Sequence, residues 1–118
     1  MEKNKLPIVY SCSGCSSAAQ TANTIAIRMD REHVAEMSCI AGVGGDVKPL
    51  VKTAKSGRDI IAIDGCPLAC SKHILARHNL EAKHHFDLTN FNVPKKQHVD
   101  PDPQLTKKVY HQILELMQ

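Results

Sequence analysis

The sequence has few aromatic residues and no tryptophan. Phe, Trp and Tyr together make up only 3% of its 118 residues, so the core has to be built from aliphatic side chains. Apolar residues account for 42% of the chain, which is enough for a globular domain that needs no disulfides. We therefore expect a single domain spanning residues 1–118.

The chain also lacks long apolar runs and blocks of like charge. No stretch reaches the length of about eighteen apolar residues that predicts a membrane span, and the apolar run at 6–10 is too short for a signal peptide. The net charge is only +3, with lysines and arginines scattered along the chain, a pattern that does not favour a nucleic-acid partner. We expect a cytoplasmic protein with no membrane partner.

Apolar periodicity predicts strands that alternate with helices. The pattern gives strands at 6–10, 34–40, 60–63 and 84–88, and helices at 16–29, 49–55, 67–79 and around 109–117. Residues 89–103 are polar and contain Pro94, Pro101 and Pro103, which is typical of an irregular connection. Strands alternating with helices predict a three-layer α/β/α fold around a mostly parallel sheet of about four strands.

The cysteines follow the predicted strands. Cys12 and Cys15 come after the first strand, Cys39 lies at the end of the second, and Cys66 and Cys70 follow the third. Parallel strands end at the same edge of a sheet, and the loops at that edge commonly form binding sites. All five cysteines are therefore predicted to lie at one edge.

Two close pairs of cysteines favour a metal ion as the partner. Cys12 and Cys15 flank a turn that contains Gly14, while Cys66 precedes Pro67 at a predicted helix start and Cys70 lies one turn further on. Four thiolates at about 2.3 Å from one ion are the usual structural zinc arrangement. Zinc is therefore the predicted cofactor, with Cys12, Cys15, Cys66 and Cys70 as its ligands.

Other interpretations of the cysteines stay open at this stage. The same sulfurs are compatible with a thiol-dependent redox or sulfur-transfer protein, or with an iron–sulfur protein. Cys39 is either a further metal ligand or a small buried residue at a strand end. His73 can approach the cysteines, whereas we expect solvated surface positions for His78, His84, His85, His98 and His111. No Ser-His-Asp or paired-carboxylate arrangement predicts catalysis.

Three short motifs resemble those of a known family. They are Cys12-Ser-Gly-Cys15-Ser, Met37-Ser-Cys39-Ile-Ala-Gly42 and Ile63-Asp64-Gly65-Cys66-Pro67-Leu-Ala-Cys70. In this order they resemble the DGC-domain family, named for its Asp-Gly-Cys triplet and described as zinc-binding, over about residues 8–88. The resemblance implies a zinc site built from Cys12, Cys15, Cys66 and Cys70, with Cys39 as a further candidate.

Overall fold

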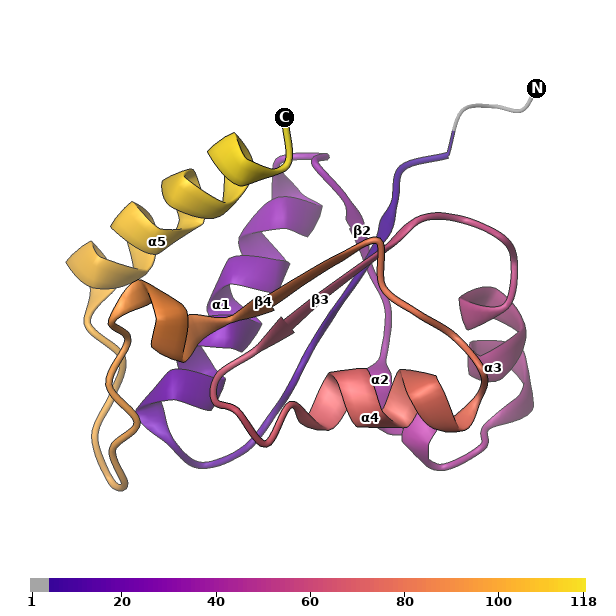
Figure 1. The fold of residues 1–118 in the computed structure, drawn as a ribbon, viewed down its shortest axis with the longest axis horizontal. Coiled ribbons are helices and arrows are strands. Elements are labelled where there is room, and N and C mark those ends of the chain that lie inside the picture. The colour runs from indigo at the N-terminus through magenta and orange to yellow at the C-terminus, as the bar shows by residue number, and fades with distance from the viewer. Residues whose placement is uncertain (1–4) are drawn as a thin grey trace.

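The fold is built around a single four-stranded sheet. It is described by a computed structural model that covers residues 5–118 (Figure 1). In chain order the elements are β1 (Ile8–Ser11), α1 (Ser17–Arg31), β2 (Glu36–Met37), α2 (Ile40–Gly44), α3 (Lys48–Ala54), β3 (Ile60–Asp64), α4 (Cys70–Arg77), β4 (His84–Asp87), the 3-10 helix η1 (Leu88–Phe91) and α5 (Pro103–Leu116). The strand order is β2-β1-β3-β4, and every pair is parallel. The predicted α/β fold class is confirmed.

The two central strands are apolar on both sides because helices cover both faces of the sheet. Every residue of β1 and β3 is buried, and the register pairs Ile8 with Ile60 and Tyr10 with Ala62. Unbroken apolar runs of this kind are typical of central parallel strands. Their carboxyl ends therefore carry the loops that begin with Cys12 and Gly65 to the same edge.

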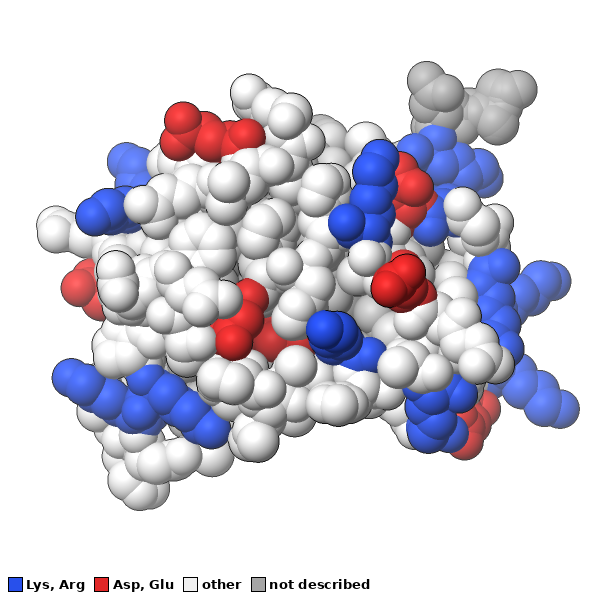
Figure 2. Space-filling view, in the orientation of Figure 1, with Lys and Arg blue, Asp and Glu red and all other residues white. Residues whose placement is uncertain are grey.

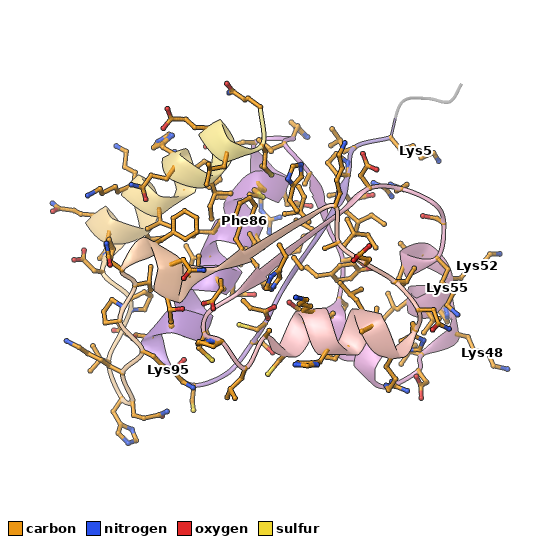
Figure 3. All side chains as sticks on the ribbon, in the orientation of Figure 1. Lys5, Lys48, Lys52, Lys55, Phe86 and Lys95 are labelled. Atoms are coloured by element: carbon orange, nitrogen blue, oxygen red, sulfur yellow. The ribbon has the colours of Figure 1, made fainter. Side chains whose placement is uncertain are left out.

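The helices form two layers around the sheet. Helices α1 and α5 cover one face, and α2, α3 and α4 lie over the other (Figure 1). Val9 and Ile61 point toward the first layer, together with Phe86 of β4 (Figure 3). Ile8 and Tyr10 point toward the second. Successive residues of a strand thus alternate between two separate apolar clusters.

Helix α1 begins directly after the first cysteine loop. The Ser16 hydroxyl accepts a hydrogen bond from the Ala19 amide at 3.1 Å, as an N-cap residue does. The buried face of the helix includes Ala22, Ile25 and Met29, at the predicted spacings of three and four. The amino end of α1 therefore lies at the carboxyl edge of the sheet, beside the cysteines.

The second predicted strand is wrong in length. It was expected at 34–40, but β2 contains only Glu36 and Met37. The amides of Val34 and Ala35 still bond back to the Met29 carbonyl, at 2.9 and 3.3 Å, so both residues belong to the turn that ends α1. The glycine-rich segment after β2 is mostly the short helix α2 rather than a loop.

Gly42 has a packing role in α2. A Cβ placed on Gly42 would stand 1.9 Å from the Leu50 Cδ1 atom of α3. The missing side chain lets α2 and α3 pack closely, so the glycine serves helix packing here rather than flexibility.

The third predicted helix starts later than expected. It was predicted at 67–79, but α4 covers Cys70–Arg77. The Ala69 amide donates to the Cys66 carbonyl at 3.0 Å, which closes a turn, and Ala69 itself has left-handed backbone angles (φ 50°, ψ 53°). A helix cannot continue backward through that conformation, so Cys70 is the first residue of α4.

The remaining long connection, predicted at 89–103, is irregular as expected, apart from η1 at its start.

Within residues 5–118, no helix combines the length and apolar composition needed to cross a membrane. On the face shown in Figure 2, basic side chains are most numerous at the right-hand end of the long axis, others lie at the left end and near the middle, and acidic side chains are interspersed among them.

Candidate metal centre

The cysteines lie in three loops at the carboxyl edge of the sheet. Cys12 and Cys15 are in the loop between β1 and α1, Cys39 is the N-cap of α2, and Cys66 lies between β3 and α4, where Cys70 begins the helix. None of the five forms a disulfide. Because β1 and β3 are neighbours, the loops that hold the two close pairs lie next to each other.

Cys12 is the buried member of the group. Only 8% of its surface is exposed, and its sulfur accepts a hydrogen bond from the Gly65 amide at 3.1 Å. Burial is the main cause that raises the pKa of the Cys12 thiol, to about 11. The Gly65 amide lowers that pKa in part, while nearby Asp64, Cys70 and Cys66 raise it further. The Gly65 amide thus connects the Cys12 sulfur directly to the loop that holds Cys66.

Gly65 allows this close approach of the two loops. A Cβ on Gly65 would stand 2.7 Å from the Ala18 carbonyl carbon and 2.8 Å from the Ala19 nitrogen. These are backbone atoms of the first turn of α1, which cannot move aside as a flexible side chain can. Only glycine lets the loop after β3 pass so near α1 with its amide directed at the Cys12 sulfur.

The irregular segment after η1 reaches the sulfurs of Cys66 and Cys15. The Lys95 ammonium lies 3.4 Å from the Cys66 sulfur, and the Cys15 thiol donates to the Gln97 side-chain oxygen at 3.3 Å. Figure 3 shows Lys95 close to the start of α1, at the end of the molecule opposite to the lysines of α3. Two side chains from a segment distant in sequence thus contact the predicted ligands.

Ser17 of α1 anchors this segment. Its hydroxyl donates to the Pro94 carbonyl at 3.0 Å and accepts from the Lys96 amide at 3.0 Å, while the Ser17 amide donates to the Lys96 carbonyl at 2.8 Å. Sequence reasoning treated this segment only as a connection, because it has no apolar periodicity. Its prolines were the only available signal that it is held in a fixed path.

Cys39 stands apart from the other four in its surroundings. It is exposed, so the interpretation as a small buried residue is wrong. Cys39 affects the buried Tyr10: burial raises the pKa of this phenol, and Cys39 adds a smaller part to the rise. The Ser38 hydroxyl lowers that pKa, yet it does not reach hydrogen-bonding geometry, and within residues 5–118 the buried Tyr10 hydroxyl has no partner.

The expectation that His78 and His85 are solvated surface residues is wrong. His85 bonds through Nε2 to the Asp64 carboxylate at 2.8 Å, and the Nε2 atom of His78 lies 2.9 Å from the Val43 carbonyl. Both side chains are largely covered, with 23% and 11% exposed. His73 is exposed on α4. The parallel register of β3 and β4, which sequence periodicity does not reveal, brings His85 to Asp64.

The donor set suits a soft divalent ion, although its members are not gathered around one point. Within residues 5–118, no three His, Cys, Asp or Glu side chains are grouped closely enough to hold a metal ion. The atoms that are close, however, are thiols, and one of them accepts an amide hydrogen bond of the kind that zinc-bound sulfurs accept from their surroundings. The residues fit zinc in chemistry, and the exposed thiols would have to close around it.

The fold and this edge define a class of small parallel α/β proteins with cysteines at the strand ends. The chain belongs to the DGC domain family, whose profile matches residues 8–113. This confirms the predicted resemblance and extends it into α5. A Pseudomonas aeruginosa (strain PAO1) relative is 49% identical over 112 residues, covering 95% of this chain and 86% of the relative, and is called "Anaerobic and virulence modulator AnvM". No solved structure shows a significant match.

Proposed function

We propose that this protein binds a zinc ion through cysteine thiolates at the carboxyl edge of its sheet. The observation that carries the proposal is the position of Cys12: its buried sulfur accepts at 3.1 Å the amide of Gly65, the residue directly before Cys66 in the neighbouring loop. The two close pairs of cysteines thus lie in neighbouring loops at one edge of the sheet, and membership in the DGC family supports the same interpretation.

The four sulfurs would contribute differently. Cys12 provides the fixed ligand, because burial and the Gly65 amide hold it in place. Cys66 begins the turn closed by Ala69, and Cys70 directly follows that turn, so they can act as one pair. Cys15 is exposed and would complete the set by moving from Gln97 toward the other three. Cys39 remains a candidate for a further sulfur at the edge of the site.

Zinc would supply a positive charge that cross-links the two loops. The thiol of Cys12 has a pKa of about 11, so without a cation it stays protonated at neutral pH. Ligation requires the thiolate, and binding therefore releases protons. We expect zinc affinity to rise with pH. The P. aeruginosa relative is called a modulator, and we extend a regulatory role to this chain as part of the proposal.

Elemental analysis of protein purified without added metal tests the proposal directly. We expect about one zinc per chain, and we expect cobalt to give the intense visible bands of a tetrahedral thiolate complex. Cys12→Ser should lower zinc affinity by orders of magnitude, because a closed thiolate site cannot replace a lost sulfur. Cys39→Ser should keep full occupancy, because the other four sulfurs already make a closed set, and this variant therefore tests whether Cys39 is a further ligand.

Two results would overturn this assignment. A wild-type protein that neither contains nor takes up zinc contradicts the metal function itself. Zinc retained by Cys12→Ser but lost by Cys39→Ser contradicts the ligand set and moves Cys39 into it.

A thiol-dependent redox or sulfur-transfer function is the second candidate. The contact between the Lys95 ammonium and the Cys66 sulfur at 3.4 Å favours it, since a neighbouring cation stabilises a thiolate nucleophile. In that case metal content is low and Cys66→Ala removes the fastest phase of the reaction with a thiol probe, while the exposed Cys15, Cys39 and Cys70 still react slowly. An iron–sulfur cluster would make the protein brown, so its visible absorption spectrum separates that alternative from both others.

A further inference from the structure

Asp64 is a fully buried carboxylate with an unusually complete set of partners. None of its surface is exposed. Its first oxygen accepts the Ser71 amide at 2.9 Å and the Ser71 hydroxyl at 2.7 Å. Its second accepts from the Lys72 amide at 3.3 Å and from His85 Nε2 at 2.8 Å. A buried carboxylate needs such donors because burial without them is costly.

Three of these donors come from the first turn of α4. The residue at the N-cap position, Ala69, has no side-chain oxygen and makes no capping bond. Asp64 takes over that task from the end of β3 by accepting the amides of Ser71 and Lys72, which would otherwise lack partners at the start of a helix. The Asp64–Ser71 contacts close a loop, and both Cys66 and Cys70 lie inside it.

The fourth donor comes from a different part of the chain. His85 belongs to β4, and the β3–β4 register places it opposite Ala62, on the same face of the sheet as Asp64. A carboxylate only accepts hydrogen bonds, so Nε2 of His85 carries the hydrogen. His85 thereby ties the Asp64 carboxylate, and with it the cysteine loop, to the edge strand.

We infer that His85 is a positioning residue for the cysteine site: through Asp64 it fixes the loop and the first turn of α4 that hold Cys66 and Cys70 beside Cys12. This inference rests on the proposed function for its consequence in zinc binding. The claim that His85 fixes the loop concerns the metal-free protein alone. It can therefore be tested separately from the effect of His85 on zinc binding.

Hydrogen exchange of the metal-free protein tests the structural part. His85→Leu removes the Nε2 donor, and we expect the Ser71 and Lys72 amides to exchange about tenfold faster, while amides in α1 are unchanged. His85→Gln restores an N–H near the position of Nε2 and should restore most of the protection. His84→Leu is the matched control: His84 is the neighbouring residue of β4, faces the other layer and stacks on Phe86. Equal exchange in His85→Leu and wild type would overturn the inference.

Zinc titration tests the consequence. We expect His85→Leu to bind zinc about 10- to 100-fold more weakly, the usual effect of losing an outer contact of a metal site, with broadened cobalt bands. His85→Gln should lie close to wild type. If wild type binds no zinc, the proposed function fails, and the exchange experiment still decides the positioning role. If wild type and His85→Leu bind equally tightly, the proposed function stands and the positioning role falls.

A second variant covers the case in which His85→Leu does not fold. Ser71→Ala keeps the backbone amide and removes only the hydroxyl that lies 2.7 Å from Asp64. Ser71→Thr keeps the hydroxyl and is its control. We expect weaker zinc binding for Ser71→Ala and near wild-type binding for Ser71→Thr. Equal affinities in both variants would overturn the idea that the Asp64 network positions the cysteines.

Discussion

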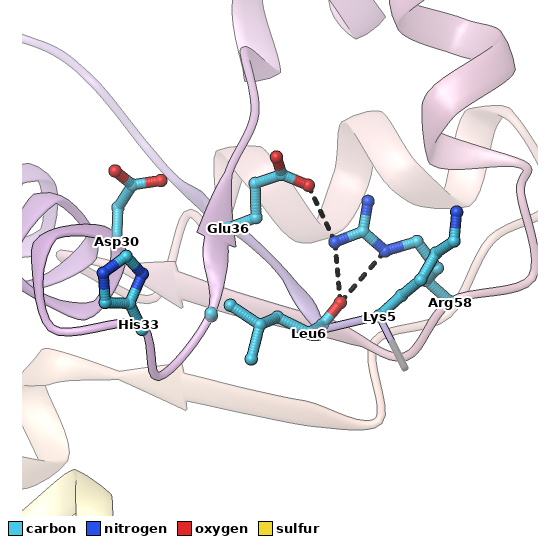
Figure 4. A pocket seen from close by; sticks show the side chains of 7 residues that line it. Lys5, Leu6, Asp30, His33, Glu36 and Arg58 are labelled. Atoms are coloured by element: carbon cyan, nitrogen blue, oxygen red, sulfur yellow. Dashed lines mark hydrogen bonds and ion pairs between the residues drawn. The ribbon is translucent and has the colours of Figure 1, made fainter. Parts of the chain in front are cut away.

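The two edges of the parallel sheet use their polar side chains in different ways. At the amino edge, charged groups pair with one another around a hollow of about 540 Å³ (Figure 4). Arg58 donates to Glu36 at 2.8 Å and to the Leu6 carbonyl at 2.7 and 3.0 Å. Asp30 accepts the Met37 amide at 2.9 Å. These contacts hold the segment before β1, the strand β2 and the segment before β3 together.

At the carboxyl edge, polar groups hold loops in place and leave sulfur atoms available. Asp64 and Gly65 use their contacts to fix the turn that holds Cys66 and the start of α4, whereas Cys39 and Cys70 are exposed. The difference teaches that the amino edge pairs its charged groups with one another, while the carboxyl edge fixes its loops and leaves thiols free for the zinc ion that we propose. Substitutions at the two edges should therefore have separable effects on folding and on zinc binding.

The largest expected effect comes from metal removal. With zinc at about a thousand times its dissociation constant, binding stabilises the fold by about 4 kcal/mol, and a chelator should remove that amount from the free energy of unfolding. Helical circular dichroism should persist, because the two apolar clusters contain only one cysteine, Cys12. Thermal melts with and without chelator measure both quantities. Complete loss of helicity would show instead that the metal site is a folding nucleus.

Gly65→Ala should have the next largest effect, because it introduces a Cβ where the loop after β3 packs against the backbone of α1. Its Cβ would stand 2.7 Å from backbone atoms of Ala18, and we expect a loss of about 3 kcal/mol in the free energy of unfolding together with weak zinc binding. Gly44→Ala is the control: its new Cβ meets only the Ile74 side chain, at 3.2 Å, and should cost far less. Urea unfolding of both variants provides the comparison, and similar costs would contradict it.

Arg58→Met tests the amino edge. Its side chain is only 17% exposed, and its loss leaves the Leu6 carbonyl without its donor, so we expect a cost of about 2 kcal/mol. Zinc content should not change. Arg31→Met, at a side chain that is 71% exposed, should cost less than about 1 kcal/mol. Loss of zinc from Arg58→Met would show that the two edges are not independent.

Much of this contrast could be predicted from the sequence. The alternation of elements and the cysteine spacing indicate the sheet and the edge at which the sulfurs meet, because apolar periodicity and strand direction are local properties of the chain. The contact between Asp64 and His85 could not be predicted, because it depends on the register between β3 and β4. Lys95 and Gln97 were missed because they lie in a segment without periodicity, anchored by Ser17.

A smaller effect is expected where α1 meets α5. The Tyr110 hydroxyl donates to Glu32 at 2.7 Å, and Tyr110→Phe should cost about 1 kcal/mol at pH 8. Burial, with Glu32 second, raises the pKa of Tyr110 to about 12. An acid with a raised pKa in the folded state stabilises the fold below its unfolded pKa of 10.0, and this contribution is lost as the pH rises toward 12.

Unfolding of wild type and Tyr110→Phe over this pH range measures the difference between them. We expect the advantage of wild type to shrink above pH 10. An advantage that stays constant up to pH 12 would mean that the phenol is not the titrating group.

The smallest expected effect has the opposite sign and lies at the carboxyl edge. Ala69 holds left-handed angles (φ 50°, ψ 53°), which cost an L-residue about 1 kcal/mol more than glycine. Ala69→Gly relieves that cost but loses a buried methyl group and gives the unfolded chain more freedom. We therefore expect a net gain of only about 0.5 kcal/mol.

Ala76→Gly is the matched control, because Ala76 is an exposed residue in the last turn of α4. Glycine there should cost up to about 1 kcal/mol. Urea unfolding of the metal-free variants measures the two opposite signs without any contribution from zinc. Zinc affinity adds a second comparison: Ala69→Gly loosens the turn between Cys66 and Cys70 and should bind zinc slightly more weakly despite its higher stability. A variant that loses stability and keeps its affinity would show that the left-handed turn at Ala69 supports the fold rather than the site.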